Sequence, residues 1–321
     1  MTLKLNHLAA AAALTLSLIP QAHADSVSVG PYEVHHVGGK PLMLTGGEGT
    51  LAYSPGSNFN GTDPNTLGGL LGALNLGRIE ARGVGGASID PIFTNDEFDE
   101  PVRTELKARA QVSGYTVDTT TGQILAVSST GGVEHLGTRI SGTLTGGVAT
   151  VTNLRFDLQS MLVYADLQGT KAAVGTKPAI NYSLPGTALW TIGSVSGPTV
   201  IDPAALALSG QARIDALVAQ GFTYSFVNGH DEFAANNVIS GLKVTNAGFD
   251  FFKNSLGLLS TGVGALGAVN ADPQGWGTVT SKLTFAIPLV PEPSSYAMAG
   301  TGLLLVGGML RRRRAAANAT H

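Results

Sequence analysis

Residues Val102–Val112 read VRTELKARAQV and alternate between two kinds of side chain. The small or apolar set is Val102, Thr104, Leu106, Ala108, Ala110 and Val112, and the charged or polar set is Arg103, Glu105, Lys107, Arg109 and Gln111. A period of two places each set on its own face of a β-strand. The stretch therefore predicts a strand with one buried face and one solvated face.

The sequence on either side extends this strand into hairpins. The strand continues through Val117 to the turn-rich segment DTTTG (118–122) and returns over 123–128, which predicts a first hairpin. A second hairpin is predicted to pair 148–156 with 161–167 across 157–160. Further strands are expected at 188–192, 222–227 and 279–287, the last with Val279, Ser281, Leu283, Phe285 and Ile287 on one face.

Composition agrees with many short strands joined by tight turns. The chain has 321 residues, of which 43 are glycine, and its aromatic content is only 6%. No proline-rich linker or run of charge interrupts residues 25–289. We expect a mainly β fold, with sandwich-like antiparallel sheets and a few helical inserts, in one domain over 25–289.

Three segments carry helix start signals. Asp202-Pro203 provides an N-cap followed by proline at the first helical position, and predicts a helix that ends near Gly221. Asn246 is expected to cap a helix through Leu256, and Asp63-Pro64 to open a short one through Leu74. VTNLRFD (151–157) and VTNAGFD (244–250) are alike, but we interpret them as a strand and a helix start, so no duplicated unit is inferred.

Composition and charge exclude several classes of protein. The chain has no cysteine, which removes disulfides, thiolate metal sites and cysteine nucleophiles. Residues 25–289 carry 14 basic against 21 acidic side chains, and no basic patch with interleaved aromatics appears. A surface of that sign repels phosphate backbones, so nucleic acid is not an expected partner.

The sequence motifs give little support to an enzyme. GVGALG (262–267) matches the dinucleotide glycine pattern, but neither a preceding strand nor a following helix is indicated. NGHDE (228–232) and NDEFDE (95–100) offer metal or acid–base groups, and both are interpreted as charged surface turns. His35, His36, His135 and His230 show no recognisable nucleophile or metal spacing. We predict no catalytic residue, no metal and no cofactor, and keep a secreted hydrolase with convergent side chains as an alternative.

The N-terminus has the order of a secretory signal peptide. Lys4 precedes the apolar run Leu8–Ile19, and Pro20 is followed by the small-residue site Ala22-His23-Ala24. This order predicts removal of residues 1–24 by signal peptidase, with cleavage before Asp25.

The C-terminus has a three-part tail over 290–314, followed by seven residues, 315–321. Val290 precedes Pro291-Glu292-Pro293, an apolar run follows over 296–310, and Arg311, Arg312, Arg313 and Arg314 form a basic cluster. Fifteen residues span roughly 22 Å as a helix, less than the hydrocarbon core of about 30 Å. The tail resembles the PEP-CTERM sorting signal, which implies processing by an exosortase in the inner membrane of a Gram-negative bacterium that makes exopolysaccharide. A retained C-terminal anchor is the alternative.

Two further resemblances concern the central part of the chain. VTNLRF (151–156) and VYAD (163–166) resemble glycine-rich exosortase substrates and, more loosely, surface haem-uptake domains. The second resemblance implies Tyr164 as a candidate axial ligand of haem. The leading expectation is a non-enzymatic surface or extracellular-matrix protein, with exopolysaccharide as a candidate partner and a haem-binding surface domain as an alternative.

Overall fold

The structure is a computed structural model that describes residues 25–288. The residues of the predicted signal peptide, including Ala22 and Ala24, and those of the predicted sorting signal, Val290–Pro293 and Arg311–Arg314, lie outside the described residues. Asp25, the residue expected after signal cleavage, is the first described one.

Sixteen strands form most of the described chain. They are β1 (Ser26–Val29), β2 (Val34–Val37), β3 (Lys40–Tyr53), β4 (Glu80–Val84), β5 (Ser88–Asn95), β6 (Pro101–Asp118), β7 (Ile124–Ser129), β8 (Gly132–Gly137), β9 (Gly147–Asp157), β10 (Leu162–Lys171), β11 (Ile180–Thr191), β12 (Ser194–Ser196), β13 (Thr223–Val227), β14 (His230–Ser240), β15 (Lys243–Val244) and β16 (Gly277–Ala286). Five α-helices are inserted between them: α1 (Gly69–Leu76), α2 (Pro203–Ala207), α3 (Gly210–Ala219), α4 (Asn246–Ser255) and α5 (Ser260–Ala271), with a 3-10 turn at Pro64–Thr66.

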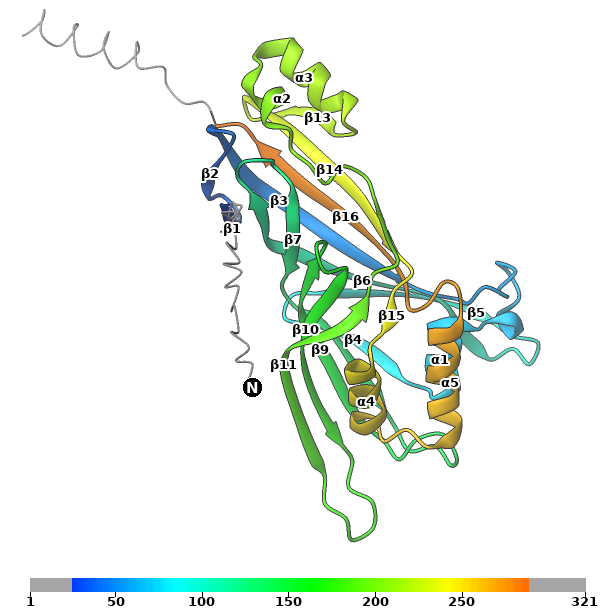
Figure 1. Ribbon diagram of the computed structural model, residues 1–321. Helices are drawn as coiled ribbons and strands as arrows, with labels where there is room; N and C mark the ends of the chain where they lie inside the picture. Colours follow the sequence, from blue (N-terminus) through cyan, green and yellow to red (C-terminus); the bar gives the residue numbers. More distant parts are fainter. Residues whose placement is uncertain (1–24, 289–321) are drawn as a thin grey trace, which may run out of the picture.

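Strand β6 connects two antiparallel sheets (Figure 1). Its first half pairs with β3 and β5, in the sheet that continues through β16, β14 and β12. Its second half pairs with β1 and β7, in the sheet that continues through β9, β10, β11 and β15. The mainly β, antiparallel fold class is therefore confirmed, and residues of both sheets share one hydrophobic cluster.

The alternation predicted for 102–112 is confirmed. Thr104, Leu106, Ala108 and Val112 are buried, while Glu105 and Arg109 are exposed. The ladder between β6 and β7 then shifts register between Val112 and Gly114. An extra residue in a strand exchanges its two faces, which is why Tyr115 and Val117 point into the core beyond this bulge.

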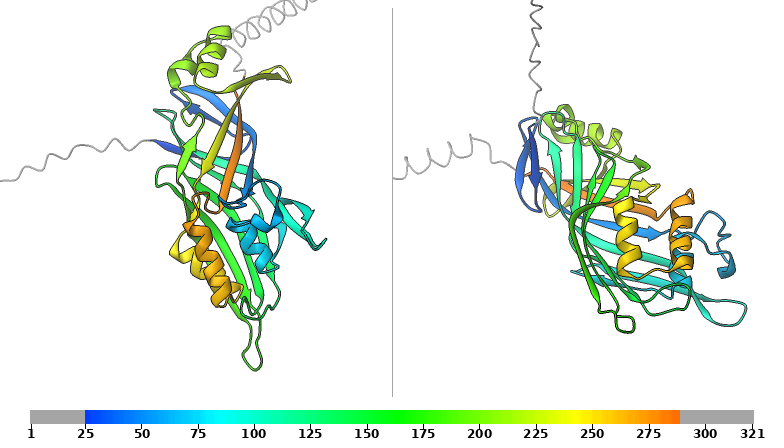
Figure 2. Two further views of the ribbon diagram at one scale, coloured as in Figure 1. Left: turned by 90° about the vertical axis from the view of Figure 1, so that its right-hand side faces the viewer. Right: turned by 60° about the horizontal axis from the view of Figure 1, so that its bottom comes forward.

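The helices cover one side and one end of the sheets (Figure 2). Helix α4 packs against β9, β10 and β11, and α1 packs against α5 and β6. Helices α2 and α3 pack together at the other end, near β3 and β13. None of the helices between residues 25 and 288 is long and apolar enough to cross a membrane.

Both predicted hairpins form. Strands β6 and β7 pair across a turn in which Asp118 Oδ1 accepts hydrogen bonds from the backbone N–H groups of Thr120 and Thr121, at 2.8 and 3.0 Å. Strands β9 and β10 pair across a turn that Asp157 holds in the same way. The strands expected at 188–192, 222–227 and 279–287 correspond to the end of β11, to β13 and to β16.

The helix predictions need three corrections. The helix predicted from Asp202 to Gly221 is two helices, because Leu208 and Ser209 have extended backbone between Ala207, the end of α2, and Gly210, the start of α3. Thr245 caps α4, and Asn246 is its first helical residue. The segment opened by Asp63-Pro64 is a 3-10 turn, with α1 a separate helix after it. Asp202 and Asp63 do cap, each accepting from a backbone N–H.

Candidate functional site

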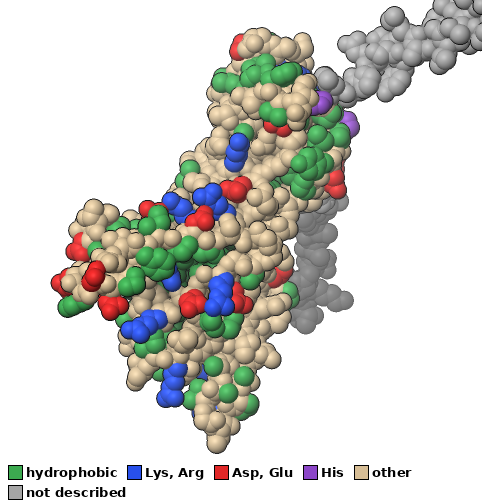
Figure 3. Space-filling model, turned by 180° about the vertical axis from the view of Figure 1, so that it is seen from behind, with side chains coloured by type: hydrophobic (Ala, Val, Ile, Leu, Met, Phe, Trp, Pro, Cys, Tyr) green, Lys and Arg blue, Asp and Glu red, His purple; other side chains and the backbone are tan. Residues whose placement is uncertain are grey.

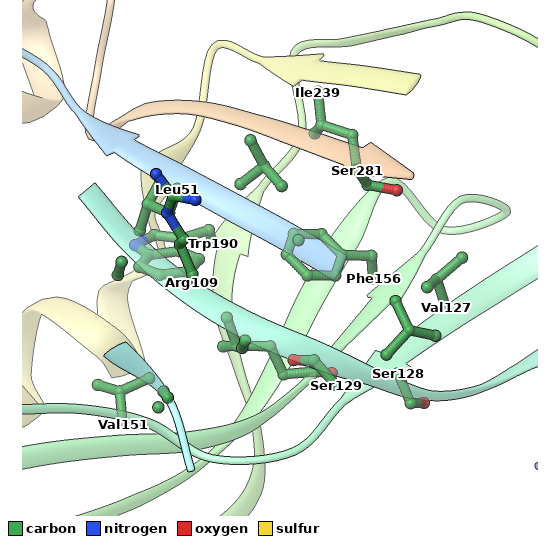
Figure 4. Close-up of a pocket in the computed structure, with 18 of the residues that line it drawn as sticks. Leu51, Arg109, Val127, Ser128, Ser129, Val151, Phe156, Trp190, Ile239 and Ser281 are labelled. Atoms are coloured by element: carbon green, nitrogen blue, oxygen red, sulfur yellow. Dashed lines mark hydrogen bonds between the residues drawn. The ribbon is translucent and has the colours of Figure 1, made fainter. Parts of the chain in front are cut away.

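An apolar cavity of about 80 Å³ lies between the two sheets (Figure 4). Leu51 of β3, Phe156 of β9, Trp190 of β11 and Ile239 of β14 contribute to its wall. Small residues occupy the places where bulky side chains would fill this space: Gly49, Ala108, Ala110 and Ser281. Cores are normally packed without such voids, so a cavity of this size is a feature of the fold that needs an explanation.

Four polar atoms at the cavity are buried without partners. The Nε1 atoms of Trp190 and Trp276, the Oδ1 atom of Asn237 and the Nδ1 atom of His135 make no hydrogen bond within residues 25–288. All four residues line the cavity. A buried polar group without a partner costs about 1–3 kcal/mol, so these atoms are available to a ligand that offers hydrogen-bonding groups.

A buried tyrosine–histidine pair lies in the same wall. Tyr53, at the end of β3, and His135, in the middle of β8, are both about 5% exposed. The Tyr53 hydroxyl and His135 Nε2 are 3.2 Å apart and hydrogen-bonded. In the tautomer that carries its proton on Nδ1, the imidazole accepts this bond from the phenol. The pair places one oxygen and one nitrogen atom, both able to bind a metal ion, inside an otherwise apolar space.

Burial controls the charge state of this pair. It lowers the pKa of His135 to about 4, because the imidazolium ion would be desolvated. Burial likewise raises the pKa of Tyr53, while the positive charge of Arg103 works in the opposite direction. The Arg103 guanidinium is itself fixed by donating to the Ile79 carbonyl at 3.2 Å. At neutral pH both members of the pair are therefore uncharged, and the Arg103 charge offsets only part of the cost of burying a Tyr53 phenolate.

Aromatic rings surround the pair. The ring of Phe252, on α4, meets the His135 imidazole edge-on at 5.9 Å between centroids. Trp276 lies 4.9 Å from Phe252 and 5.8 Å from Trp190, again between ring centroids. A smaller cavity of about 40 Å³ adjoins this cluster and shares His135, Phe252 and Trp276 with the first. Flat apolar walls of this kind suit a flat apolar ligand.

A second tyrosine–histidine pair is buried elsewhere. The hydroxyl of Tyr115, on β6, is hydrogen-bonded to Nε2 of His35, on β2. Burial lowers the pKa of His35 and raises that of Tyr115. Phe285 packs edge-on against Tyr115 at 5.2 Å. Neither residue of this pair lies in the wall of the cavity, so the second pair has the same chemistry without the space.

Tyr164, the haem-ligand candidate from the sequence, lies elsewhere. It is half-buried in the wall of a polar, open groove and not in the apolar cavity. The sequence offered His135 as one of four histidines with no assigned role, and it did not indicate Tyr53 as a site residue. The two are 82 residues apart, so no local spacing marks the pair. The only signal was that a histidine alternates into the buried face of the GVEHLG strand, β8.

Two of the remaining sequence candidates lie in surface turns, and the third lies within a helix. NGHDE (228–232) forms the turn between β13 and β14, where Asp231 accepts hydrogen bonds from Arg213 and Tyr224. NDEFDE (95–100) forms the turn between β5 and β6. GVGALG (262–267) lies inside α5, so it is not a strand-to-helix nucleotide loop. No group of three His, Cys, Asp or Glu side chains in the described chain is arranged to hold a metal ion.

Acidic and basic side chains are mixed on the face of the molecule that Figure 3 shows. Figure 3 shows basic and acidic side chains interspersed across the middle of one face, with broad uncharged areas beside them. Of the six ion pairs among the described residues, five have at least one largely exposed partner. That face therefore carries no field of a single sign to attract a strongly charged polymer.

Comparison with known proteins gives one weak structural likeness. No protein-family model and no curated protein matches the chain. The solved structure of the haem-binding protein HtaB from Corynebacterium glutamicum is similar with a TM-score of 0.30 and 14% sequence identity, over 81% of this chain and 96% of that one. A TM-score that low does not establish a shared fold, so the site is interpreted from its own geometry.

Proposed function

We propose that this is an exported, non-enzymatic surface or matrix protein whose β-rich domain binds haem in the cavity between its sheets. The observation that carries the proposal is the buried Tyr53–His135 pair in the wall of an apolar cavity. A structural hydrogen bond between two core residues does not need a cavity beside it. A ligand site needs both the donor atoms and the space.

The chemistry of the pair suits ferric haem. Tyrosine is one of the side chains that hold haem iron in proteins, and it does so through its oxygen as a phenolate. The nearest acceptor for the phenol proton is His135 Nε2, at 3.2 Å. The Arg103 charge favours the phenolate form of Tyr53. Tyr53 would thus hold the iron after losing its proton to solvent, neutral His135 would remain hydrogen-bonded to the phenolate oxygen through Nε2, and the Arg103 charge would offset part of the cost of the buried negative charge.

The walls fit the flat part of such a ligand. Phe252, Trp190 and Trp276 offer apolar ring faces, and the unpaired indole N–H groups offer hydrogen bonds to polar substituents. The free space, about 80 Å³, is smaller than a porphyrin. Binding therefore requires the cavity to widen.

The test is a titration of ferric haem into the purified full chain, followed by its absorption in the Soret region. We expect saturable binding by the wild type. Tyr53→Phe should weaken binding at least about tenfold and remove the charge-transfer absorption of a phenolate–iron bond.

Tyr164→Phe is the matched control, because it makes the same chemical change in the polar groove. It should leave the haem spectrum unchanged. Equal binding by wild type and Tyr53→Phe, with circular dichroism confirming that both are folded, would overturn the proposal. Loss of binding only in Tyr164→Phe would move the site to the groove.

The cellular address of the protein rests on the two ends of the chain. The order Ala22-His23-Ala24 supports export, and Pro291-Glu292-Pro293 followed by Arg311–Arg314 supports sorting by an exosortase to the cell surface or matrix. The intact mass of surface-extracted protein tests this part separately. A mass that corresponds to a chain starting at Asp25 and lacking Arg311–Arg314 is expected. Retention of the four arginines would contradict sorting.

A further inference from the structure

A second hollow, open to solvent and of about 640 Å³, lies on the sheet that holds β7, β9 and β10. We call it the polar groove and define it by Ser128, Thr130, Asn153, Arg155, Tyr164 and Asp166, which line it. It is independent of the haem proposal, which concerns the cavity between the sheets. Polar side chains project into it, while carbon atoms make up most of its exposed surface, and Ala165 and Gly186 line it beside the Tyr164 ring.

Irregular backbone creates the groove. The ladder between β9 and β10 shifts register between Tyr164 and Asp166, and the ladder between β10 and β11 shifts on both sides of the same segment. Asn153, opposite on β9, has a φ of +54°, which is unusual for a residue other than glycine. Bulges re-aim side chains and are frequent next to binding sites. Val163, Ala165 and Leu167 stay buried in regular alternation, so Tyr164 and Asp166 both project from the opposite, outer face of β10, where these irregularities lie.

Two of the groove's charged groups are held in fixed positions. The Asp166 carboxylate accepts from Asn153 Nδ2 and from the Gly186 backbone N–H, each at 2.9 Å. The Asn153 hydrogen bond, followed by that from Gly186, lowers the pKa of Asp166, so it stays ionised. Arg155 pairs with Asp157 at 3.2 Å, and its guanidinium lies 5.8 Å from the centroid of the Tyr164 ring.

Other polar groups in the groove are unused. Within residues 25–288, no hydrogen bond involves the side-chain hydroxyls of Ser128, Thr130 or Tyr164. Asp166 keeps unused lone pairs, because an ionised carboxylate can accept about four hydrogen bonds. The groove thus presents hydroxyls, an amide, a guanidinium and a carboxylate around one aromatic ring.

We propose that the polar groove binds a neutral oligosaccharide chain. Sugar hydroxyls both donate and accept, and therefore match a mixed set of hydroxyl, amide, guanidinium and carboxylate partners. The Tyr164 ring offers an apolar surface to the C–H face of a sugar. Asp157 neutralises Arg155, which leaves the charge of Asp166 to repel acidic sugars and phosphates. The open shape leaves room for a chain to continue beyond the groove.

The experiment is a glycan array probed with the full chain, carrying neutral hexose oligomers and uronic-acid oligomers, followed by calorimetric titration of the best neutral oligomer. We expect binding to neutral oligomers. Tyr164→Ala should weaken it at least about tenfold, because loss of an aromatic stacking surface costs on the order of 1.4 kcal/mol. The double variant Ser128→Ala, Thr130→Val should weaken it while leaving the thermal melting curve unchanged.

Tyr224→Ala is the control, since Tyr224 lies on β13, in the other sheet. It removes an exposed tyrosine with its own hydrogen bond, to Asp231, and should not affect glycan binding. The proposal is overturned if no neutral oligomer binds, if only uronic-acid oligomers bind, or if Tyr164→Ala binds as the wild type does.

Discussion

The two buried tyrosine–histidine pairs have the same hydrogen bond and different surroundings. Tyr53 and His135 line the cavity between the sheets, beside Trp276 and its unpaired indole N–H. Tyr115, the partner of His35, belongs to a second hydrophobic cluster that also contains Leu42, Leu44, Phe233 and Phe285, and Phe285 packs on the tyrosine ring. In both, burial raises the tyrosine pKa and lowers the histidine pKa.

The difference shows that donor chemistry alone does not define a ligand site. A buried Tyr–His bond satisfies two polar groups inside a core, which is a sufficient reason for the Tyr115–His35 pair. At Tyr53–His135 the core also leaves free volume and unpaired polar atoms, which reduce stability. We infer that the first hydrophobic cluster keeps these defects because a ligand fills them.

The two pairs should differ most in how much stability is lost when the tyrosine is replaced by alanine. Tyr115→Ala should lower the free energy of unfolding by about 3–5 kcal/mol, because it opens a new cavity in a close-packed cluster. Tyr53→Ala should cost clearly less, since it enlarges space that already exists. Urea denaturation of the full chain measures both. If Tyr53→Ala costs as much as Tyr115→Ala, the cavity is not present in solution.

Acid should destabilise the folded protein more through the Tyr53–His135 pair than through the Tyr115–His35 pair. Folded His135 has a pKa of about 4, and an unfolded histidine titrates near 6.5, so the unfolded state binds more protons between these values. Neutral, buried His135 therefore contributes to the free energy of unfolding in full above about pH 6.5. This contribution, about 3 kcal/mol in total, is lost as the pH falls toward 4.

The check is the pH dependence of unfolding in His135→Gln and His35→Gln. The first variant should flatten the profile between pH 4 and 6.5 more than the second, because His35 has the smaller displacement of its pKa. A steeper loss of pH dependence in His35→Gln would reverse the assignment.

Adding a larger side chain should lower stability in the second hydrophobic cluster and have little effect on stability beside the cavity. Ala235→Leu adds volume to the packed second cluster, where Ala235 is fully buried, and should destabilise by about 1–3 kcal/mol. Ser281→Leu adds similar volume beside the cavity and should change stability by about 0.5 kcal/mol or less. It should also block haem binding. Normal haem binding by folded Ser281→Leu would show that the ligand does not enter there.

Much of the fold follows from local sequence pattern. Alternation over 102–112 determines which face of β6 is buried, and Asp118 and Asp157 fix the two hairpin turns through their side-chain oxygens. Helix ends were less predictable. Extended backbone at Leu208 and Ser209 divides the helix expected after Asp202. Helix α5 is built largely of glycine, alanine and other small residues, and shows no apolar stripe to identify it.

The candidate site was not predictable in the same way. Tyr53 ends β3 and His135 lies within β8, and these strands meet only because β6 places the two sheets face to face. The cavity depends on Gly49, Ala108 and Ser281 lying near one another across three strands. Such a void is a property of the packed whole, and neither period nor motif encodes it in one segment.

The most direct test of the central claim compares one atom in each pair. Tyr53→Phe and Tyr115→Phe both remove a hydroxyl that is bonded to a buried histidine, so each should cost about 1 kcal/mol in stability. In haem-loaded protein, electron paramagnetic resonance and visible absorption report whether a phenolate binds the iron. We predict that the phenolate signature is lost in Tyr53→Phe and unchanged in Tyr115→Phe. Its persistence in Tyr53→Phe, or its loss in Tyr115→Phe alone, would contradict the account.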